Sequence, residues 1–257
     1  MSNWQFGFRA GRACRDPLFI VTELMERRGK ERVFAGFLDV AKAYDCVWRK
    51  GMWARLKEIG VRGKMLSVIM ALYARNEVGV RVGGVVHEWY EELTGLRQGC
   101  VVSPLLFAIY VNELPKEIEE KGGGGVQVGG KWVRCLMFAD DVILVASTKE
   151  GLQRSFDVAE WFAKRWRFSY NFGPDKTAVV VAGGVREGEE WVLCGEKVMV
   201  VNDYRYLGVR LMGGEEGEVD EETGRDAGEG QKIVLESMGD GDGGRGIAEC
   251  KRSEDVV

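Results

Sequence analysis

The chain has 257 residues, and 46% of them are hydrophobic, which is enough to bury a sizeable core in one large domain or two small ones. A single histidine excludes a histidine-rich metal site, and no apolar run approaches the roughly 20 residues that cross a membrane. Six cysteines without a C-x-x-C pair, and no basic and apolar leader at Met1, favour a reducing compartment. We therefore expect an intracellular protein, nuclear or cytoplasmic, that is neither secreted nor bound to a membrane.

The net charge of -4 conceals an asymmetry along the chain. Residues 213–257 hold 14 acidic and 5 basic side chains, whereas residues 1–64 hold 14 basic and 7 acidic ones. The acidic end is rich in glycine and has no aromatic residue or proline, which predicts a disordered tail. The basic start is a bias that a phosphate backbone favours, although composition alone fits a solvated charged face equally well.

The first third of the chain alternates predicted helices and a strand. Apolar spacing predicts a helix around residues 18–25 and a short buried strand over residues 33–38 that ends at Asp39. Apolar positions recur at helical spacing over residues 48–59, and Gly60 can end that helix.

The middle and end of the chain add helices and several hairpins. A helix is expected over residues 65–72, and a second has Ser103 as its N-cap and a buried face that runs to Leu114. Ser147 has capping-box spacing and opens a third. Strands or hairpins are expected over residues 78–86, 132–137, 142–146, 176–181, 191–193, 198–201 and 204–209.

The sequence Phe138-Ala139-Asp140-Asp141 lies between two apolar runs, where a β-hairpin would turn. Adjacent carboxylates at the end of buried strands repel each other, and a hard divalent cation would relieve that repulsion. Taken alone, the pair fits an ordinary solvated turn better than a metal site.

A further acid, Asp39, changes this interpretation. It ends the predicted strand over residues 33–38, and a βαββ order would bring that strand end beside Asp140 and Asp141. Three converging carboxylates predict a site for two Mg²⁺ ions, with Mn²⁺ as the alternative. Such a site suits in-line phosphoryl transfer, in which one ion activates a 3′-hydroxyl and the other holds a triphosphate.

Several motifs now resemble those of one family, in the expected order. The chain is similar over residues 5–211 to reverse transcriptases, and its motif sequences most resemble those of retrotransposons without long terminal repeats. Phe37–Asp45 resembles the first catalytic motif, Leu96–Phe107 the nucleotide-pocket motif, and Phe138–Asp141 the Asp-Asp box. Gly173–Thr177 and Tyr206–Val209 resemble two later palm motifs, and Gln5–Arg9 resembles the end of the fingers.

The resemblance implies roles around the carboxylates. Asp39 and Asp140 would bind metal, and Asp141 would support the site with weaker coordination. Lys176 would neutralise or protonate the leaving pyrophosphate, although a lone lysine beside a strand is usually a solvated side chain. A primer-side hairpin, or primer grip, would consist of Tyr206, Leu207, Gly208 and Val209.

The resemblance also implies a nucleotide pocket. Tyr44 would be a steric gate that rejects a 2′-hydroxyl, with an ordinary core aromatic as the alternative. Gln98 and Gly99 would approach the incoming nucleotide, where glycine permits close backbone contact. Arg9 and Arg12 would reach the triphosphate or the template.

The implied fold is α+β, a polymerase palm with an antiparallel sheet packed on helices, partial fingers and no complete thumb. Residues 1–32 would be a fingers remnant, residues 33–212 the palm and residues 213–257 the acidic tail.

The expected activity is RNA-directed DNA synthesis, with an RNA template, a DNA primer and deoxynucleoside triphosphates as partners. The alternative is a catalytically inactive, nucleic-acid-binding remnant of a retrotransposon. A palm-type nucleotide cyclase is disfavoured because it needs neither the Gln98-Gly99 loop nor the Tyr206 hairpin.

Overall fold

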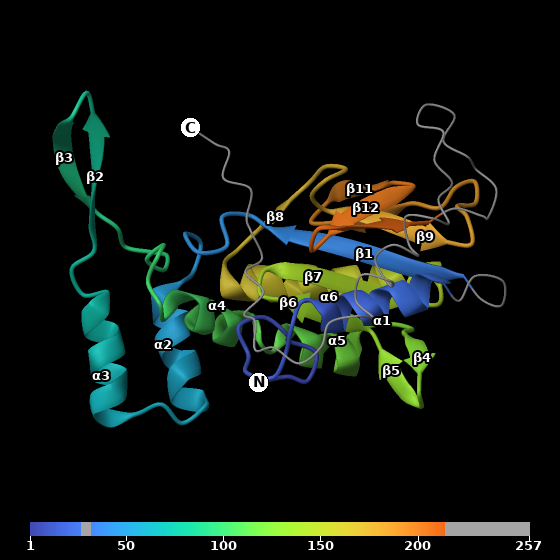
Figure 1. Cartoon of the computed structure of the whole chain (residues 1–257), viewed down its shortest axis with the longest axis horizontal. Helices are drawn as coiled ribbons and strands as arrows, with labels where there is room; N and C mark the ends of the chain where they lie inside the picture. The colour runs from blue at the N-terminus through green and yellow to red at the C-terminus, as the bar shows by residue number, and fades with distance from the viewer. Residues whose placement is uncertain (27–31, 214–257) are drawn as a thin grey trace, which may run out of the picture. The chain divides into compact units, whose positions relative to one another are not determined.

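The structure, a computed structural model, describes residues 1–26 and 32–213 (Figure 1). No helix in these two ranges is long and apolar enough to cross a membrane. The helices are α1 (Arg15–Glu26), α2 (Arg49–Glu58), α3 (Gly63–Leu72), α4 (Ser103–Val111), α5 (Leu114–Lys121) and α6 (Lys149–Trp166). The strands are β1 (Val33–Val40), β2 (Glu77–Val82), β3 (Val85–Glu91), β4 (Val126–Val128), β5 (Lys131–Val133), β6 (Cys135–Phe138), β7 (Asp141–Ala146), β8 (Tyr170–Asn171), β9 (Ala178–Ala182), β10 (Trp191–Leu193), β11 (Glu196–Val200), β12 (Asp203–Tyr206) and β13 (Val209–Met212).

The mixture of helices and strands confirms the predicted α+β class. A seven-stranded sheet has the order β10-β11-β9-β1-β7-β6, and β8 pairs with the end of β1. Its ladders are antiparallel except between β11 and β9. The antiparallel sheet was therefore predicted correctly apart from one parallel pair, which arises because β10 lies between β9 and β11 in the chain. The predicted acidic tail falls almost wholly on residues 214–257, outside the described residues.

Strand β1 lies between β9 and β7 and is covered on both faces. Every residue of β1 except Asp39 is buried, as expected for a strand without a solvent face. Gly36 lets α6 pack closely, because a Cβ there would lie 2.7 Å from the Phe156 ring. The apolar run before Asp39 thus places that acid at the edge of the core.

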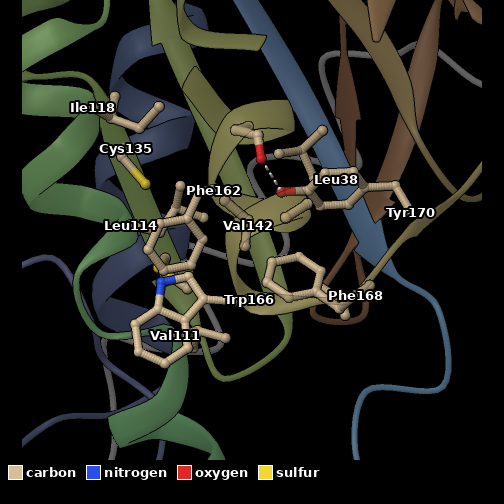
Figure 2. Packing of buried hydrophobic residues seen from close by; sticks show 14 of the residues in the cluster. Leu38, Val111, Leu114, Ile118, Cys135, Val142, Phe162, Trp166, Phe168 and Tyr170 are labelled. Atoms are coloured by element: carbon tan, nitrogen blue, oxygen red, sulfur yellow. Dashed lines mark hydrogen bonds between the residues drawn. The ribbon is translucent and has the colours of Figure 1, made fainter. Parts of the chain in front are cut away.

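One face of the sheet packs against α4, α5 and α6 (Figures 1 and 2). Figure 2 shows Leu38 and Val142 of the sheet in the same cluster as Phe162 and Trp166 of α6. The apolar residues of α6 recur at helical spacing, so a single face of this helix covers the sheet.

The opposite face packs against α1 and the β12–β13 hairpin. Phe37 of β1 stacks on Tyr204 of β12, with ring centroids 4.1 Å apart and ring planes inclined by 13°. Because side chains alternate along a strand, Asp39 points to the same face as Phe37. The hairpin predicted over residues 204–209 therefore lies on the same face of the sheet as the Asp39 side chain.

Helix α3 and the β2–β3 hairpin form as predicted but bury little. Every residue of β2 and β3 is exposed, and Leu66 is the one buried residue among those of α3. Apolar spacing therefore predicted the secondary structure of this region correctly, although the apolar side chains are mostly exposed instead of packed in a core.

The predicted cap and length of the helix after Gly99 were wrong. Ser103 is the first residue of α4, and its hydroxyl donates to the carbonyl of Arg97 at 2.7 Å instead of capping the helix. The helix ends at Val111, and a separate helix begins at Leu114. Pro115 explains the break, because proline has no N–H to continue the ladder but suits a first helical turn.

The predicted cap of α6 was wrong by one residue. Thr148, not Ser147, accepts the N–H of Gly151, at 3.0 Å. Either hydroxyl could cap the helix, and the two possible first residues of the helix differ by only one position.

Candidate active site

Asp39 and Asp141 lie directly opposite each other at the ends of β1 and β7. Opposite residues of an antiparallel pair point to the same face of the sheet. The register Asp39↔Asp141 therefore juxtaposes two acids that are far apart in the sequence, as the predicted strand order requires.

The Asp39 side chain is held by residues from β8 and the following loop. Asn171 donates its side-chain amide to Oδ2 of Asp39, and the Lys176 Nζ lies 3.6 Å from Oδ1. The Asp39 N–H donates to the Thr177 hydroxyl, which is fully buried, at 3.3 Å. The predicted residue Lys176 is thus an ion-pair partner of Asp39, whereas Asn171 and Thr177 are contacts that the sequence did not reveal.

Asp140 and Asp141 lie where the hairpin turns, as predicted: Asp140 is in the turn and Asp141 begins β7. The preceding residue, Ala139, has a φ of 58°, in the left-handed region that residues with a Cβ rarely adopt. The turn therefore has a specific backbone conformation immediately before the acid pair.

The β12–β13 hairpin, which contains the predicted primer-grip residues, is electrostatically coupled to the acids. Burial raises the pKa of Tyr204, and the charges of Asp39, Asp141 and Asp175 raise it further. Burial is also the main cause of the raised pKa of Tyr206, followed by the charge of Asp141. Both phenols therefore stay protonated, and the Tyr204 hydroxyl donates to the Lys176 carbonyl at 2.6 Å. The turn at Leu207 and Gly208 has positive φ angles of 47° and 88°.

The donor chemistry of this sheet end fits a hard cation. Carboxylate oxygens are the ligands that Mg²⁺ and Mn²⁺ prefer, and Asp39 and Asp141 present them from opposed strand positions. Within residues 1–26 and 32–213, no group of three or more His, Cys, Asp or Glu side chains is gathered closely enough to hold one metal ion. The predicted three-carboxylate ligand set stays a prediction.

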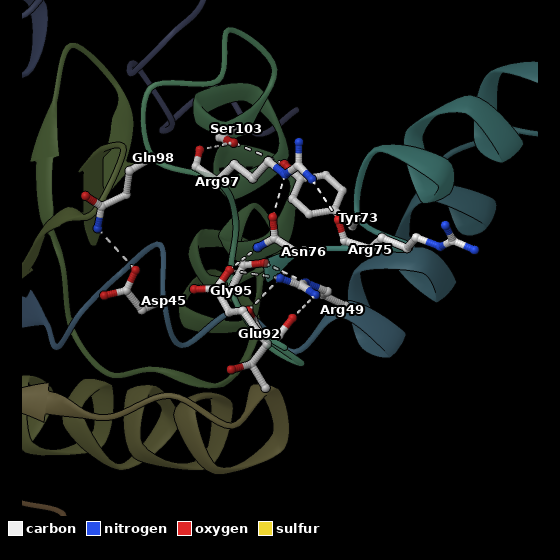
Figure 3. Close-up of polar contacts among 11 residues, drawn as sticks. Asp45, Arg49, Tyr73, Arg75, Asn76, Glu92, Gly95, Arg97, Gln98 and Ser103 are labelled. Atoms are coloured by element: carbon white, nitrogen blue, oxygen red, sulfur yellow. Dashed lines mark hydrogen bonds and ion pairs between the residues drawn. The ribbon is translucent and has the colours of Figure 1, made fainter. Parts of the chain in front are cut away.

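The predicted nucleotide-pocket residues lie on two loops that pack together. The Leu96 N–H donates to the Tyr44 carbonyl at 2.7 Å. Figure 3 shows the second contact, in which Gln98 Nε2 donates to Asp45 Oδ1 at 3.2 Å. Gly99 has a φ of 78°, and a Cβ there would meet no described atom within 4 Å. Tyr44 packs against the Phe107 ring, with centroids 5.6 Å apart. The structure thus brings Tyr44, Gln98 and Gly99 into one region.

A polar network that the sequence did not predict supports this loop (Figure 3). Arg97 Nε donates to Asn76 Oδ1 at 2.6 Å, and Asn76 donates to the Glu92 carboxylate. Arg49, which is largely buried, donates to the carbonyl of Gly95 at 2.8 Å and pairs with Glu92. These partners come from α2 and from both sides of the β2–β3 hairpin, and no short motif signals such contacts.

Arg9 and Arg12 occupy different surroundings. Arg9 Nη1 donates to the carbonyl of Gln5 at 2.9 Å, within its own segment. The Arg12 guanidinium lies 5.2 Å from the centroid of the Phe6 ring and lines an open groove that also includes Trp4 and Trp132. Their predicted contacts with triphosphate or template stay predictions.

Comparison with known proteins identifies the family of the chain. A family described as "Reverse transcriptase (RNA-dependent DNA polymerase)" matches residues 1–211. The chain belongs to the reverse transcriptase family.

Relatives of this reverse transcriptase chain come from mobile elements. It is 31% identical over 128 residues to the "Retrovirus-related Pol polyprotein from type-1 retrotransposable element R2" of Nasonia vitripennis, covering 50% of this chain and 12% of that protein. It is 25% identical over 216 residues to the "RNA-directed DNA polymerase from mobile element jockey" of Drosophila funebris, covering 81% and 23%. These matches confirm the resemblance to retrotransposons without long terminal repeats, and the chain spans less than a quarter of either relative's length.

Among solved structures, this reverse transcriptase chain is similar to apo telomerase from Candida tropicalis. The TM-score is 0.48 and the sequence identity is 13%, with 76% of this chain and 39% of that chain covered. Telomerase from Candida albicans gives a TM-score of 0.47 at 11% identity and covers 72% and 32%.

Proposed function

We propose that this chain is the palm of an RNA-directed DNA polymerase that extends a DNA primer with deoxynucleoside triphosphates on an RNA template. The observation that supports this best is the register of Asp39 opposite Asp141, in a chain that matches reverse transcriptases over residues 1–211. Residues 33–212 form the palm in this proposal, and residues 1–32 belong to the fingers.

Asp39, Asp140 and Asp141 would hold the divalent cations, two Mg²⁺ ions with Mn²⁺ as a substitute. Bound there, such ions would lower the pKa of the primer 3′-hydroxyl and neutralise charge on the triphosphate. The support in this chain is a pair of facing carboxylates, of which that of Asp39 accepts a hydrogen bond from Asn171, while the Asp39 backbone N–H donates to Thr177. A carboxylate already held in one orientation loses little freedom when it binds a cation.

Lys176 acts at the leaving group. Its ammonium lies 3.6 Å from Asp39 Oδ1, and the side chain is 52% exposed, so it can turn from the carboxylate to a nearby phosphate without crossing the core. An ammonium at that place stabilises or protonates the departing pyrophosphate.

The nucleotide sugar and base meet the loop formed by Tyr44, Gln98 and Gly99. The Tyr44 ring, held against Phe107, would exclude a 2′-hydroxyl by its bulk. Arg9 and Arg12 contact the triphosphate or template in this proposal.

The primer terminus rests on the β12–β13 hairpin, at Tyr206, Leu207, Gly208 and Val209. This hairpin packs on the sheet face toward which Asp39 points, since Tyr204 stacks on Phe37. A primer held there would have its 3′ end near the carboxylates.

Primer extension tests this proposal. The purified chain receives a labelled DNA primer annealed to an RNA template, the four deoxynucleoside triphosphates and Mg²⁺. We expect extended primer that disappears when EDTA is added and returns with excess Mg²⁺. If the chain alone is inactive, residues 33–212 replace the matching segment of the jockey polymerase and the assay is repeated. RNA binding without extension in both formats would contradict the proposal and support a catalytically inactive remnant.

A further inference from the structure

Gln5 is a buried glutamine that contacts the turn before the acid pair. Its side chain is fully buried, and its Oε1 accepts the N–H of Gly7 at 2.9 Å and the N–H of Ala139 at 3.1 Å. Two backbone N–H donors can be satisfied only by the amide oxygen, so they fix the orientation of the amide. The Nε2 atom is buried with no hydrogen-bond partner among the described residues.

The Ala139 N–H belongs to a turn that needs external support. Ala139 has a φ of 58°, a conformation that an L-residue with a Cβ disfavours. An unpaired N–H in a buried position adds a further cost. The contact with Gln5 removes that cost and favours this one conformation.

The segment that contains Gln5 runs alongside β6. The Phe6 N–H donates to the Met137 carbonyl at 2.8 Å, and the Met137 N–H donates to the Trp4 carbonyl at 2.8 Å. Gly7 permits the approach, because a Cβ there would lie 2.4 Å from the Ala139 nitrogen. The main chain of residues 4–7 therefore holds Gln5 in a fixed position against the turn.

We propose that Gln5 is a positioning residue for Asp140 and Asp141, acting through the N–H of Ala139. It sets the turn from which the two carboxylates project, and thereby the affinity of the site for a divalent cation. This inference rests on the proposed function, because it assigns Gln5 to the same carboxylate site. The unpaired Nε2 supports this proposal. If Gln5 only filled the core, an apolar side chain would be more stable there, because it would leave no buried polar atom unpaired. Here the amide oxygen accepts two backbone N–H groups, which an apolar side chain cannot do.

Three variants separate positioning from general stability. Gln5→Met keeps the length of the side chain and removes the acceptor, and Gln5→Glu keeps an acceptor oxygen. Gln153→Met, on α6, is the matched control, because Gln153 Oε1 also accepts a backbone N–H, that of Val192 in β10, at 2.9 Å.

The readouts are hydrogen exchange of the Ala139 amide and the dissociation constant for Mn²⁺, measured by calorimetry on the chain without nucleic acid. For Gln5→Met we expect Ala139 to exchange faster and Mn²⁺ to bind at least about tenfold more weakly, the usual effect of losing an outer-shell contact. Gln5→Glu should keep the Ala139 protection. Gln153→Met should keep both values, even if its thermal stability falls.

Parent-like Mn²⁺ affinity in folded Gln5→Met would overturn the inference while leaving the proposed function intact. If the parent itself does not bind Mn²⁺, the proposed function fails and this inference fails with it. Should Gln5→Met not fold, it is combined with Ala139→Gly, since glycine accepts positive φ freely. The double variant should still bind Mn²⁺ more weakly than Ala139→Gly alone, and equal affinities would overturn the inference.

Discussion

The carboxylate end of the sheet and the pocket loop are built in different ways. Asp39 and Asp141 are fixed by a strand ladder and lie at the edge of a buried core. The pocket loop, residues 95–99, is restrained mainly by side-chain hydrogen bonds. Its residues Gln98 and Gly99 are exposed. The positions of the acids therefore follow from backbone register, whereas the position of the loop depends on a few polar contacts.

This difference predicts how each region responds to substitution. Neutralising an acid should remove chemistry without loss of fold, because the ladder does not need the charge. Removing a polar contact of the loop should weaken nucleotide binding by a smaller factor, because the remaining contacts still restrain the loop.

The largest effect is expected for Asp140→Asn. Loss of a metal-binding carboxylate costs several kcal/mol, so primer extension should fall at least about a hundredfold. The fold should persist, because Asp140 lies in a turn and its neutralisation relieves repulsion with Asp141. Primer extension and thermal unfolding are measured together, with Asp157→Asn, on the exposed face of α6, as the control. Unfolding of the variant, or extension at the parent rate, would show that Asp140 has another role.

The next effect concerns sugar choice at Tyr44. Tyr44→Val removes the ring that packs on Phe107 and should raise ribonucleotide incorporation relative to deoxynucleotide. An apolar pocket alone discriminates against one extra hydroxyl by about a hundredfold, so the preference for deoxynucleotides over ribonucleotides should fall toward that limit. Incorporation ratios are compared in primer extension, with Tyr90→Val on exposed β3 as the control. An unchanged ratio would make Tyr44 a core aromatic and nothing more.

A smaller effect is expected in the network that supports the pocket loop. Arg97→Met removes the hydrogen bond to Asn76 and should raise KM for the incoming nucleotide about tenfold, with kcat much less affected. Steady-state extension over a range of nucleotide concentrations measures both constants. Arg81→Met, in exposed β2, is the control and should change neither. A fall in kcat with constant KM would instead link Arg97 to chemistry.

The smallest effect is expected at the far end of β1. Arg32, just before β1, donates through Nη1 to Glu189 at 2.7 Å and lowers the pKa of that carboxyl. A lowered folded-state pKa stabilises the fold above the unfolded value of about 4.3, and the contribution is lost as pH falls through the folded pKa. Glu189→Gln should therefore lose about 1 kcal/mol at pH 7.

Urea unfolding of Glu189→Gln and of the parent, at several pH values, measures that difference. The gap should shrink as the pH falls below the unfolded value of about 4.3 and close below the lowered folded pKa, where both states of the parent bind the proton. Primer extension should stay at the parent rate, since Glu189 lies away from the carboxylate end. A constant gap at all pH values would mean that the loss comes from packing.

Local patterns were enough to predict much of the fold. Apolar runs bounded by turn residues identified β1, β7 and the β12–β13 hairpin, and the position of Asp39 at a strand end followed from its run. The division between α4 and α5 was missed because the apolar pattern continues to Leu114, while Pro115 interrupts the backbone hydrogen bonds.

The support of the site could not be predicted in the same way. Gln5 contacts Ala139 across 134 positions of sequence, and Asn171 contacts Asp39 across 132. Such pairs leave no periodic signal, because each depends on where a separate segment meets the sheet. The same holds for Arg49 and Glu92 behind the pocket loop.

In the proposed mechanism, Asp39, Asp140 and Asp141 form a divalent-cation site at the carboxylate end of the sheet. Paramagnetic broadening of backbone NMR signals by substoichiometric Mn²⁺ tests it most directly, because it locates the ion without requiring activity. We expect strong broadening at Asp39, Asp140 and Asp141, weaker broadening at Tyr204, none in α3, and loss of the effect in Asp39→Asn. Broadening centred elsewhere, or unchanged in Asp39→Asn, would contradict it.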